Sequence, residues 1–193
     1  RQMCIRDSRL YGNTEYLHSA VQGSDFVLAS QLAAPQAGWG EQYNYDMQPD
    51  WARPFEPPCV CPAVTVHCIG TLIHSYLYTK NRKYLETIPE AIAWLKSAVI
   101  EAKKWARHYE IGTNKPIYVP KIGGVKYYDY NQLSEKDKNN FDYQRLARYK
   151  GIEQFFNEVN EIGASNYISQ NPNIFKELEP CQYKKYVPSF AMK

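Results

Sequence analysis

Two arginines in this sequence follow the same Trp-Ala pair: Arg53 ends Trp51-Ala52-Arg53, and Arg107 ends Trp105-Ala106-Arg107. A planar guanidinium binds a carboxylate through two parallel hydrogen bonds, which the point charge of lysine cannot do. The stretches around the two triplets are otherwise unrelated, and a shared anionic ligand would explain why both present an arginine from a loop. We therefore expect the Arg53 and Arg107 side chains to project into one cleft.

Each of these cations also has a structural interpretation. Arg53 could pair with Asp50 or Glu56 and organise its turn, and Arg107 could pair with Glu110. For two lysines downstream, Lys115 and Lys121, the structural interpretation is that they are ordinary solvent-exposed loop residues.

Cysteine and histidine side chains are the other groups that could bind a metal. Their order along the chain is Cys59, Cys61, His67, Cys68 and His74. This spacing matches no structural zinc pattern, so buried thiols on a helix are the preferred interpretation and no metal ligand is assigned. A bridge from Cys68 to Cys59 or Cys61 is conceivable, and the remaining cysteines are Cys4 and Cys181.

Acidic and aromatic residues near the first triplet leave a further enzyme class open. A glycoside hydrolase needs two opposed carboxylates at a suitable separation. Glu41, Asp46 and Glu56 are possible acids, but nothing in the sequence fixes a pair. Trp39 and Tyr43 could stack on a sugar, although a tryptophan at a helix-to-loop corner is more often a packing anchor.

The composition indicates one domain and argues against nucleic acid and membrane as partners. Of 193 residues, 44% are hydrophobic and 17 are tyrosine, which is enough for a core. The net charge of +3 is compatible with a polyanionic ligand and far short of a nucleic-acid footprint. No apolar run approaches the length of a membrane span. Residues 1–9 differ from the rest, and we expect them to be non-native or disordered; residues 10–193 are assigned to one domain.

Hydrophobic spacing predicts a mostly α structure with helices near 14–32, 62–79, 89–103 and 144–162. Between them lie two irregular segments, 33–61 and 105–131, which contain both Trp-Ala-Arg triplets. Long ordered loops inside a compact domain are usually functional. A small β-hairpin is expected where Ile117–Val119 and Val125–Tyr128 flank Gly123-Gly124.

Three segments of the chain resemble the pectate lyases of polysaccharide lyase family ten. QLAAPQAGWGEQY at 31–43 is similar to that family's glutamine-to-GWxxQY turn. WARPFEPP at 51–58 is close to WARxYEPP, and WARHYEIGTNKPIY at 105–118 is close to WARFYEIGTNRPIF. The last two segments are long enough to be specific, and the resemblance spans roughly residues 14 to 130.

This resemblance implies an α/α-hairpin, toroid-like fold whose long loops form a cleft for polygalacturonate and calcium. It implies that Arg53 is the base that removes the C5 proton in a β-elimination. It also implies that Arg107 and, more loosely, Lys115 and Lys121 hold substrate carboxylates. A secreted or periplasmic location follows from the same family.

The sequence also departs from the family pattern. The upstream DNxAT and FDDxAM motifs, which supply calcium-binding aspartates, occur nowhere in this chain; Asn44 and Lys115 stand where Asp and Arg are usual. We therefore expect the C-terminal part of a catalytic domain, with the calcium ligands mainly upstream. The alternative is a non-catalytic or degenerate glycan-binding relative that has lost the metal site.

Overall fold

The structure is a computed structural model that describes residues 12, 14–122 and 124–175. The prediction for residues 1–9 falls outside the described residues, as do Cys4 and Cys181. Within them, none of the helices is both long enough and apolar enough to cross a membrane.

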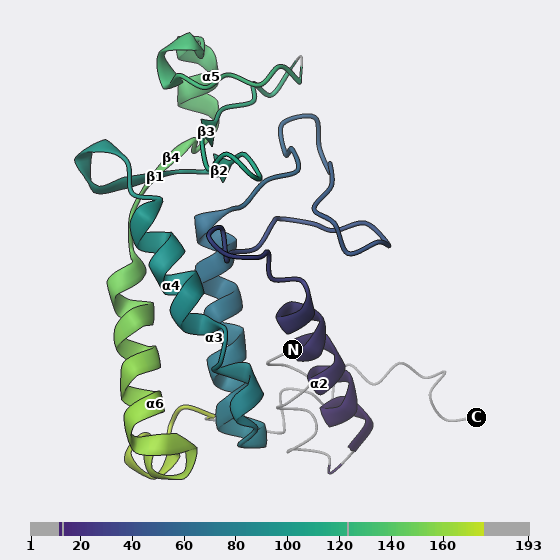
Figure 1. The fold of residues 1–193 in the computed structure, drawn as a ribbon, viewed down its shortest axis with the longest axis vertical. Helices are drawn as coiled ribbons and strands as arrows, with labels where there is room; N and C mark the ends of the chain where they lie inside the picture. Colours follow the sequence, from purple (N-terminus) through teal and green to yellow (C-terminus); the bar gives the residue numbers. More distant parts are fainter. Residues whose placement is uncertain (1–11, 13, 123, 176–193) are drawn as a thin grey trace, which may run out of the picture.

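Helices account for most of the regular structure, which confirms the mostly α prediction. The α-helices are α2 (Thr14–Ala29), α3 (Pro62–Thr79), α4 (Ile88–Ser97), α5 (Glu135–Asn140) and α6 (Tyr149–Gln170), with 3-10 turns at Arg82–Tyr84, Glu101–Lys103 and Tyr130–Gln132. In Figure 1, α3, α4 and α6 form a bundle with α2 beside α3, while the loops, the short strands and α5 gather at one end.

Helix α3 is at the centre of the core. Its buried positions Ile69, Leu72 and Ile73 are inaccessible to solvent, and they face α2, α4 and α6. Pro62 occupies the first turn, where its missing N–H costs no hydrogen bond. Lys80 ends the helix in the left-handed conformation and donates its backbone N–H to the Tyr76 carbonyl. Proline and the apolar face together explain why the predicted bounds, 62–79, are confirmed.

Four short strands form two antiparallel pairs above the bundle. Strand β1 (Lys104–Ala106) pairs with β4 (Gln144–Leu146), and β2 (His108–Tyr109) pairs with β3 (Pro116–Ile117). Val60 and Tyr109 exchange two backbone hydrogen bonds of 2.9 Å. This bridge ties the segment after the first Trp-Ala-Arg triplet to the strand that follows the second.

The structure corrects four of the predicted boundaries, including both ends of the last helix. The first helix ends at Ala29 instead of 32, and the third ends at Ser97 because the backbone becomes extended at Ile100, where φ is −96° and ψ is −174°. The fourth prediction was wrong at its start. Residues 144–146 form strand β4, and the helix begins at Tyr149 and continues past Gly163, at which φ is 77°.

The predicted hairpin is reduced to one pair of residues. Tyr118 and Tyr127 exchange backbone hydrogen bonds of 2.8 and 2.9 Å, without a continuous ladder on either side. Segment 33–61 is irregular, as predicted, whereas 105–131 contains most of β1 and the whole of β2 and β3.

Candidate functional site

Arg53 lies in a tight turn with Glu56. The Glu56 backbone N–H donates to the Arg53 carbonyl at 2.8 Å, and Arg53 Nε donates to Glu56 Oε2 at 2.6 Å while Nη2 contacts Oε1. The Glu56 side chain is only 7% exposed, but that of Arg53 is 62% exposed. The hydrogen bond raises the pKa of Arg53 and lowers the pKa of Glu56. The structural alternative, a pair with Glu56, is therefore present, although the arginine still reaches solvent.

Arg107 approaches the same carboxylate from the second triplet. Its Nη2 lies 3.0 Å from Glu41 Oε1 and 3.9 Å from Glu56 Oε1. The side chain is 16% exposed, and its backbone N–H donates to the Tyr143 carbonyl at 2.8 Å. The alternative partner considered for Arg107, Glu110, instead accepts hydrogen bonds from Thr113 and Tyr128. The structure thus brings Arg53 and Arg107 together on Glu56.

Two further residues belong to this cluster that sequence reasoning gave no such role. His108 is fully buried; its Nε2 accepts a hydrogen bond from Arg107 Nε at 3.3 Å and lies 3.4 Å from Glu41 Oε2. Burial tends to raise the pKa of Glu41, but His108 and Arg107 beside it hold that pKa below its usual value. The available signal was adjacency, because His108 follows Arg107 directly, whereas Glu41 is distant in sequence.

An aromatic ring lies against each of the two guanidinium groups. Arg53 lies 4.7 Å from the centroid of Phe55, and Arg107 lies 4.4 Å from that of Phe141. The two rings contact each other edge to face at 4.9 Å. Stacking of this kind orients a planar fork without consuming its hydrogen-bond donors. We call Glu41, Arg53, Glu56, Arg107 and His108 the arginine–carboxylate cluster.

The carboxylates of this cluster do not resemble those of a glycoside hydrolase. A general acid in that chemistry needs a raised pKa. The pKa values of Glu41 and Glu56 are both lowered by adjacent cations. Asp46, the third candidate, lies in an exposed turn in which its backbone N–H donates to Asn44.

The two predicted lysines lie outside the cluster. Lys115 is on the β2–β3 turn, with its Nζ 5.9 Å from the centroid of the Tyr128 ring. Lys121 is exposed. Its segment passes near the Arg53 turn, since a Cβ added to Gly124 would lie 3.9 Å from the Pro54 carbonyl. No hydrogen bond or ion pair within the described residues joins either lysine side chain to the cluster.

The cysteines near the cluster have the character of buried thiols. None of Cys59, Cys61 and Cys68 forms a disulfide within the described part of the chain. Burial raises the pKa of Cys61 to about 11, which keeps the thiol protonated. Among the described residues, no group of three or more His, Cys, Asp or Glu side chains could hold a metal ion.

Trp39 and Tyr43 are structural residues of the loop that carries Glu41. The Trp39 indole is 1% exposed and donates to the Val27 carbonyl at 2.7 Å, so it is a packing anchor and not a sugar platform. The Tyr43 hydroxyl accepts the Gly40 N–H at 2.8 Å. The aromatic side chains that this segment does expose are Tyr45 and Trp51.

No protein-family model matches the sequence, and no curated protein matches it. Two solved structures are similar in fold. One is a family 10 polysaccharide lyase from Cellvibrio cellulosa, and the other is a mutant of that lyase in complex with trigalacturonic acid. Each superposes with a TM-score of 0.61 at 19% sequence identity and covers 78% of this chain. The chain spans 52% of theirs, about half their length.

Proposed function

We propose that this chain is part of a polysaccharide lyase that cleaves polygalacturonate, or a related acidic polysaccharide, by β-elimination. The observation that carries the proposal is the convergence of Arg53 and Arg107 on one carboxylate. The similarity in fold to a lyase solved with trigalacturonic acid supports it. An α/α toroid completed outside the described residues and a secreted or periplasmic location belong to the same proposal.

In this proposal a substrate carboxylate takes the place that Glu56 occupies between the two arginines. The C5 proton of a galacturonate is weakly acidic, and removing it places negative charge on the carboxylate as an enediolate. The fixed guanidinium group of Arg107 stabilises that charge more strongly in the transition state than in the ground state. Arg107 suits this role because Glu41, His108 and Phe141 hold it in place.

Arg53 is proposed as the base that accepts the C5 proton, after which the bond from C4 to the leaving oxygen breaks and a C4–C5 double bond forms. A base must first be neutral, but the hydrogen bonds that Arg53 donates to Glu56 raise the pKa of Arg53. Glu56 therefore has to release Arg53 before the proton transfer. Alkaline conditions would favour this step because they deprotonate guanidinium more readily.

Calcium dependence is proposed only through ligands outside the described residues. Calcium takes six to eight oxygen ligands, mainly carboxylates. The arginine–carboxylate cluster does not fit this ion, because both of its carboxylates are engaged by cations. No step of the mechanism above passes through a metal.

To test the proposal, the chain is extended at its N-terminus with the upstream half that the proposal requires, and its β-elimination activity on polygalacturonate is measured. Product is followed by the ultraviolet absorbance of the unsaturated uronide. We expect Arg53→Ala to abolish turnover and Arg53→Lys to fail as well, with substrate affinity changed far less than rate. Lys136→Ala, at an exposed position of α5, is the comparison for a cation outside the cluster. A normal rate in Arg53→Ala would exclude Arg53 as the base.

A glycan-binding protein without catalysis is the second candidate. It is favoured by the pairing of Arg53 with Glu56 and by the lack of a metal-binding group among the described residues. This function predicts that the extended version binds oligogalacturonides but releases no unsaturated product with added calcium.

A further inference from the structure

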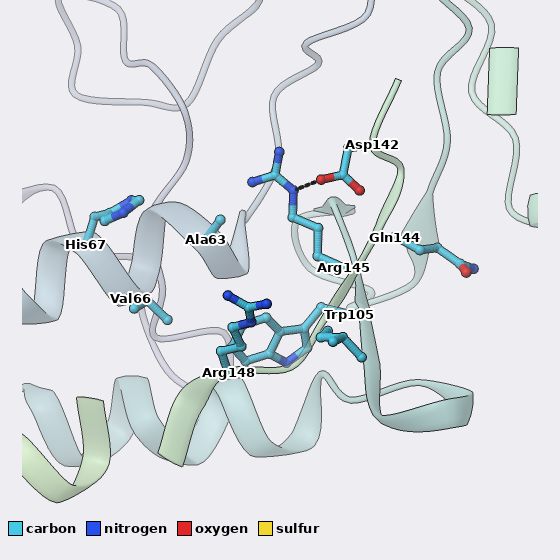
Figure 2. A pocket seen from close by; sticks show the side chains of 9 residues that line it. Ala63, Val66, His67, Trp105, Asp142, Gln144, Arg145 and Arg148 are labelled. Carbon is cyan, nitrogen blue, oxygen red and sulfur yellow. Dashed lines mark ion pairs between the residues drawn. The ribbon is translucent and has the colours of Figure 1, made fainter. Parts of the chain in front are cut away.

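A pocket with a volume of about 540 Å³ lies between the start of α3, strand β4 and the start of α6. Pockets of this size accommodate ligands of one to a few sugar units. Its lining residues are Ala63, Val66, His67, Trp105, Asp142, Gln144, Arg145, Leu146 and Arg148. Figure 2 shows these side chains, and we call this space the Arg148 pocket.

Cationic groups dominate the charge of the pocket. Among the described residues, the Arg148 side chain makes no hydrogen bond, ion pair or ring contact, and it projects into the pocket in Figure 2. Arg145 uses its Nε for an ion pair of 2.5 Å with Asp142, the one acidic side chain among the described lining residues, and its two terminal nitrogens have no partner within the described part of the chain. The imidazole of His67 is exposed at the rim. An unpaired guanidinium in a concave site favours an anionic ligand.

The rest of the lining is apolar. Val66 and Ala63 on α3, Leu146 on β4 and the edge of the buried Trp105 indole provide carbon surface below the arginines. Gln144 directs its amide away, toward the Tyr118 hydroxyl at 3.4 Å. Carbon surface under a charged rim suits a ring with C–H faces that carries a carboxylate, and a small inorganic anion would leave that surface unused.

This pocket is separate from the arginine–carboxylate cluster. Segment 141–145 lies between them: the Phe141 ring covers Arg107, whereas Asp142 and Arg145 face the pocket. Within the described residues, no hydrogen bond or ion pair links a pocket-lining side chain to Glu41, Arg53, Glu56 or Arg107.

We propose that the Arg148 pocket binds one uronate unit of an acidic oligosaccharide, at a site additional to the arginine–carboxylate cluster. Arg148 binds the carboxylate, Arg145 assists it, and Val66, Leu146 and Trp105 contact the face of the sugar ring. The choice of a uronate rests on the function proposed above; the pocket and its preference for an anion do not.

The four tryptophan indole N–H resonances allow both sites to be followed in one titration of the 193-residue chain with trigalacturonic acid. Trp105 reports on the Arg148 pocket, and Trp51, two residues from Arg53, reports on the cluster. The buried Trp39 and Trp94 report on the fold. We expect Trp105 and Trp51 to shift with independent affinities, and a neutral galactose trimer to shift neither.

Variants of exposed lining residues make the test specific. Arg148→Gln should weaken the binding reported by Trp105 about tenfold and leave that reported by Trp51 unchanged. Asp142→Asn should tighten it about threefold, because Arg145 loses its competing carboxylate. Arg53→Gln should affect Trp51 alone. Unchanged Trp39 and Trp94 resonances in each variant verify that it is folded.

The outcomes separate this inference from the proposed function. A silent Trp105, or an Arg148→Gln variant that binds as the unmodified chain does, overturns the pocket and leaves the cluster in place. A shift of Trp105 without any response of Trp51 supports the pocket and counts against the cluster. Silence of both tryptophans contradicts both proposals.

Discussion

At the scale of single residues, Glu56 decides how the arginine–carboxylate cluster behaves. Its nearly buried carboxylate is within ion-pair distance of both Arg53 and Arg107. A bound uronate would have to compete with this internal anion. The same contact keeps Arg53 protonated, so one carboxylate limits both substrate binding and the basicity of the proposed base.

We expect Glu56→Gln to increase the affinity of the chain for trigalacturonic acid about fivefold to tenfold, since the internal competitor loses its charge while its shape is kept. Isothermal titration calorimetry measures this directly. Glu135→Gln is the matched control, because Glu135 is 82% exposed and its ion-pair partner within the described residues is Lys138. An unchanged or weaker affinity in Glu56→Gln would show that the substrate carboxylate does not use the Glu56 position.

Glu41 should make folding stability sensitive to acid. Its pKa is lower in the folded chain than the value of 4.5 of an unperturbed glutamate. A carboxylate with a depressed folded pKa stabilises the fold above its unfolded pKa, and this stabilisation is lost as the pH falls through the folded pKa. The free energy of unfolding should therefore fall below about pH 4.5, as measured by urea titration at a series of pH values.

The fall of the free energy of unfolding at acid pH, which we call the acid limb, should be less steep in Glu41→Gln. Near neutral pH this variant should be less stable, because Arg107 and His108 lose a charged partner. Glu135→Gln again serves as the control and should leave the acid limb unchanged. An acid limb equally steep in Glu41→Gln would assign the pH dependence to other carboxylates.

At the scale of elements, the turn between β2 and β3 is held by residues remote in sequence. Gln36 Nε2 donates to the Glu110 carbonyl at 2.9 Å and to Asn114 Oδ1 at 3.1 Å, and Trp94 Nε1 donates to the same oxygen at 2.9 Å. Asn114 has a left-handed φ of 57°, which asparagine tolerates better than most residues. Through the hydrogen bond from Trp94, this turn holds α4 against the end of β2, the strand that carries His108. It therefore positions the cluster indirectly.

We expect Asn114→Ala to destabilise the chain by about 2–3 kcal/mol, because the Trp94 and Gln36 donors lose their acceptor and alanine is strained at this φ. Asn139→Ala, at an exposed position of α5, should change stability by less than about 0.5 kcal/mol. Chemical denaturation with matched m-values gives both numbers. Equal stability of the two variants would mean that the turn is not anchored by Asn114.

At the scale of the whole molecule, the helices form a bundle, and the loops and short strands lie at one end of it (Figure 1). The two Trp-Ala-Arg triplets enter that end on different segments and are joined by the bridge between Val60 and Tyr109. The solved lyases of similar fold are about twice as long as the part that this chain matches.

We expect the 193-residue chain alone to release little or no unsaturated uronide from polygalacturonate, with or without calcium. The physical reason is that its described residues include no group of three or more His, Cys, Asp or Glu side chains that could hold the metal, so the substrate carboxylate would not be polarised. Ultraviolet absorbance measures the product, and a chelator-treated sample is the control. Strong calcium-dependent activity would show that the metal site lies within this sequence.

The sequence by itself determined those features that depend on local spacing. The bounds of α3 follow from Pro62 and an apolar face repeated every three to four residues, and the buried core helix needs no distant partner to be recognised. The two arginines were also identified from their neighbours along the chain.

Only the tertiary structure decided which groups meet. Residues 144–146 have side chains compatible with a helix, and they form a strand because the backbone of β1 offers them hydrogen-bond partners. Arg107 pairs with Glu41 instead of the nearby Glu110 because the Val60–Tyr109 bridge brings the earlier loop against it. Ion pairs between distant segments depend on chain folding, and local sequence patterns do not encode them.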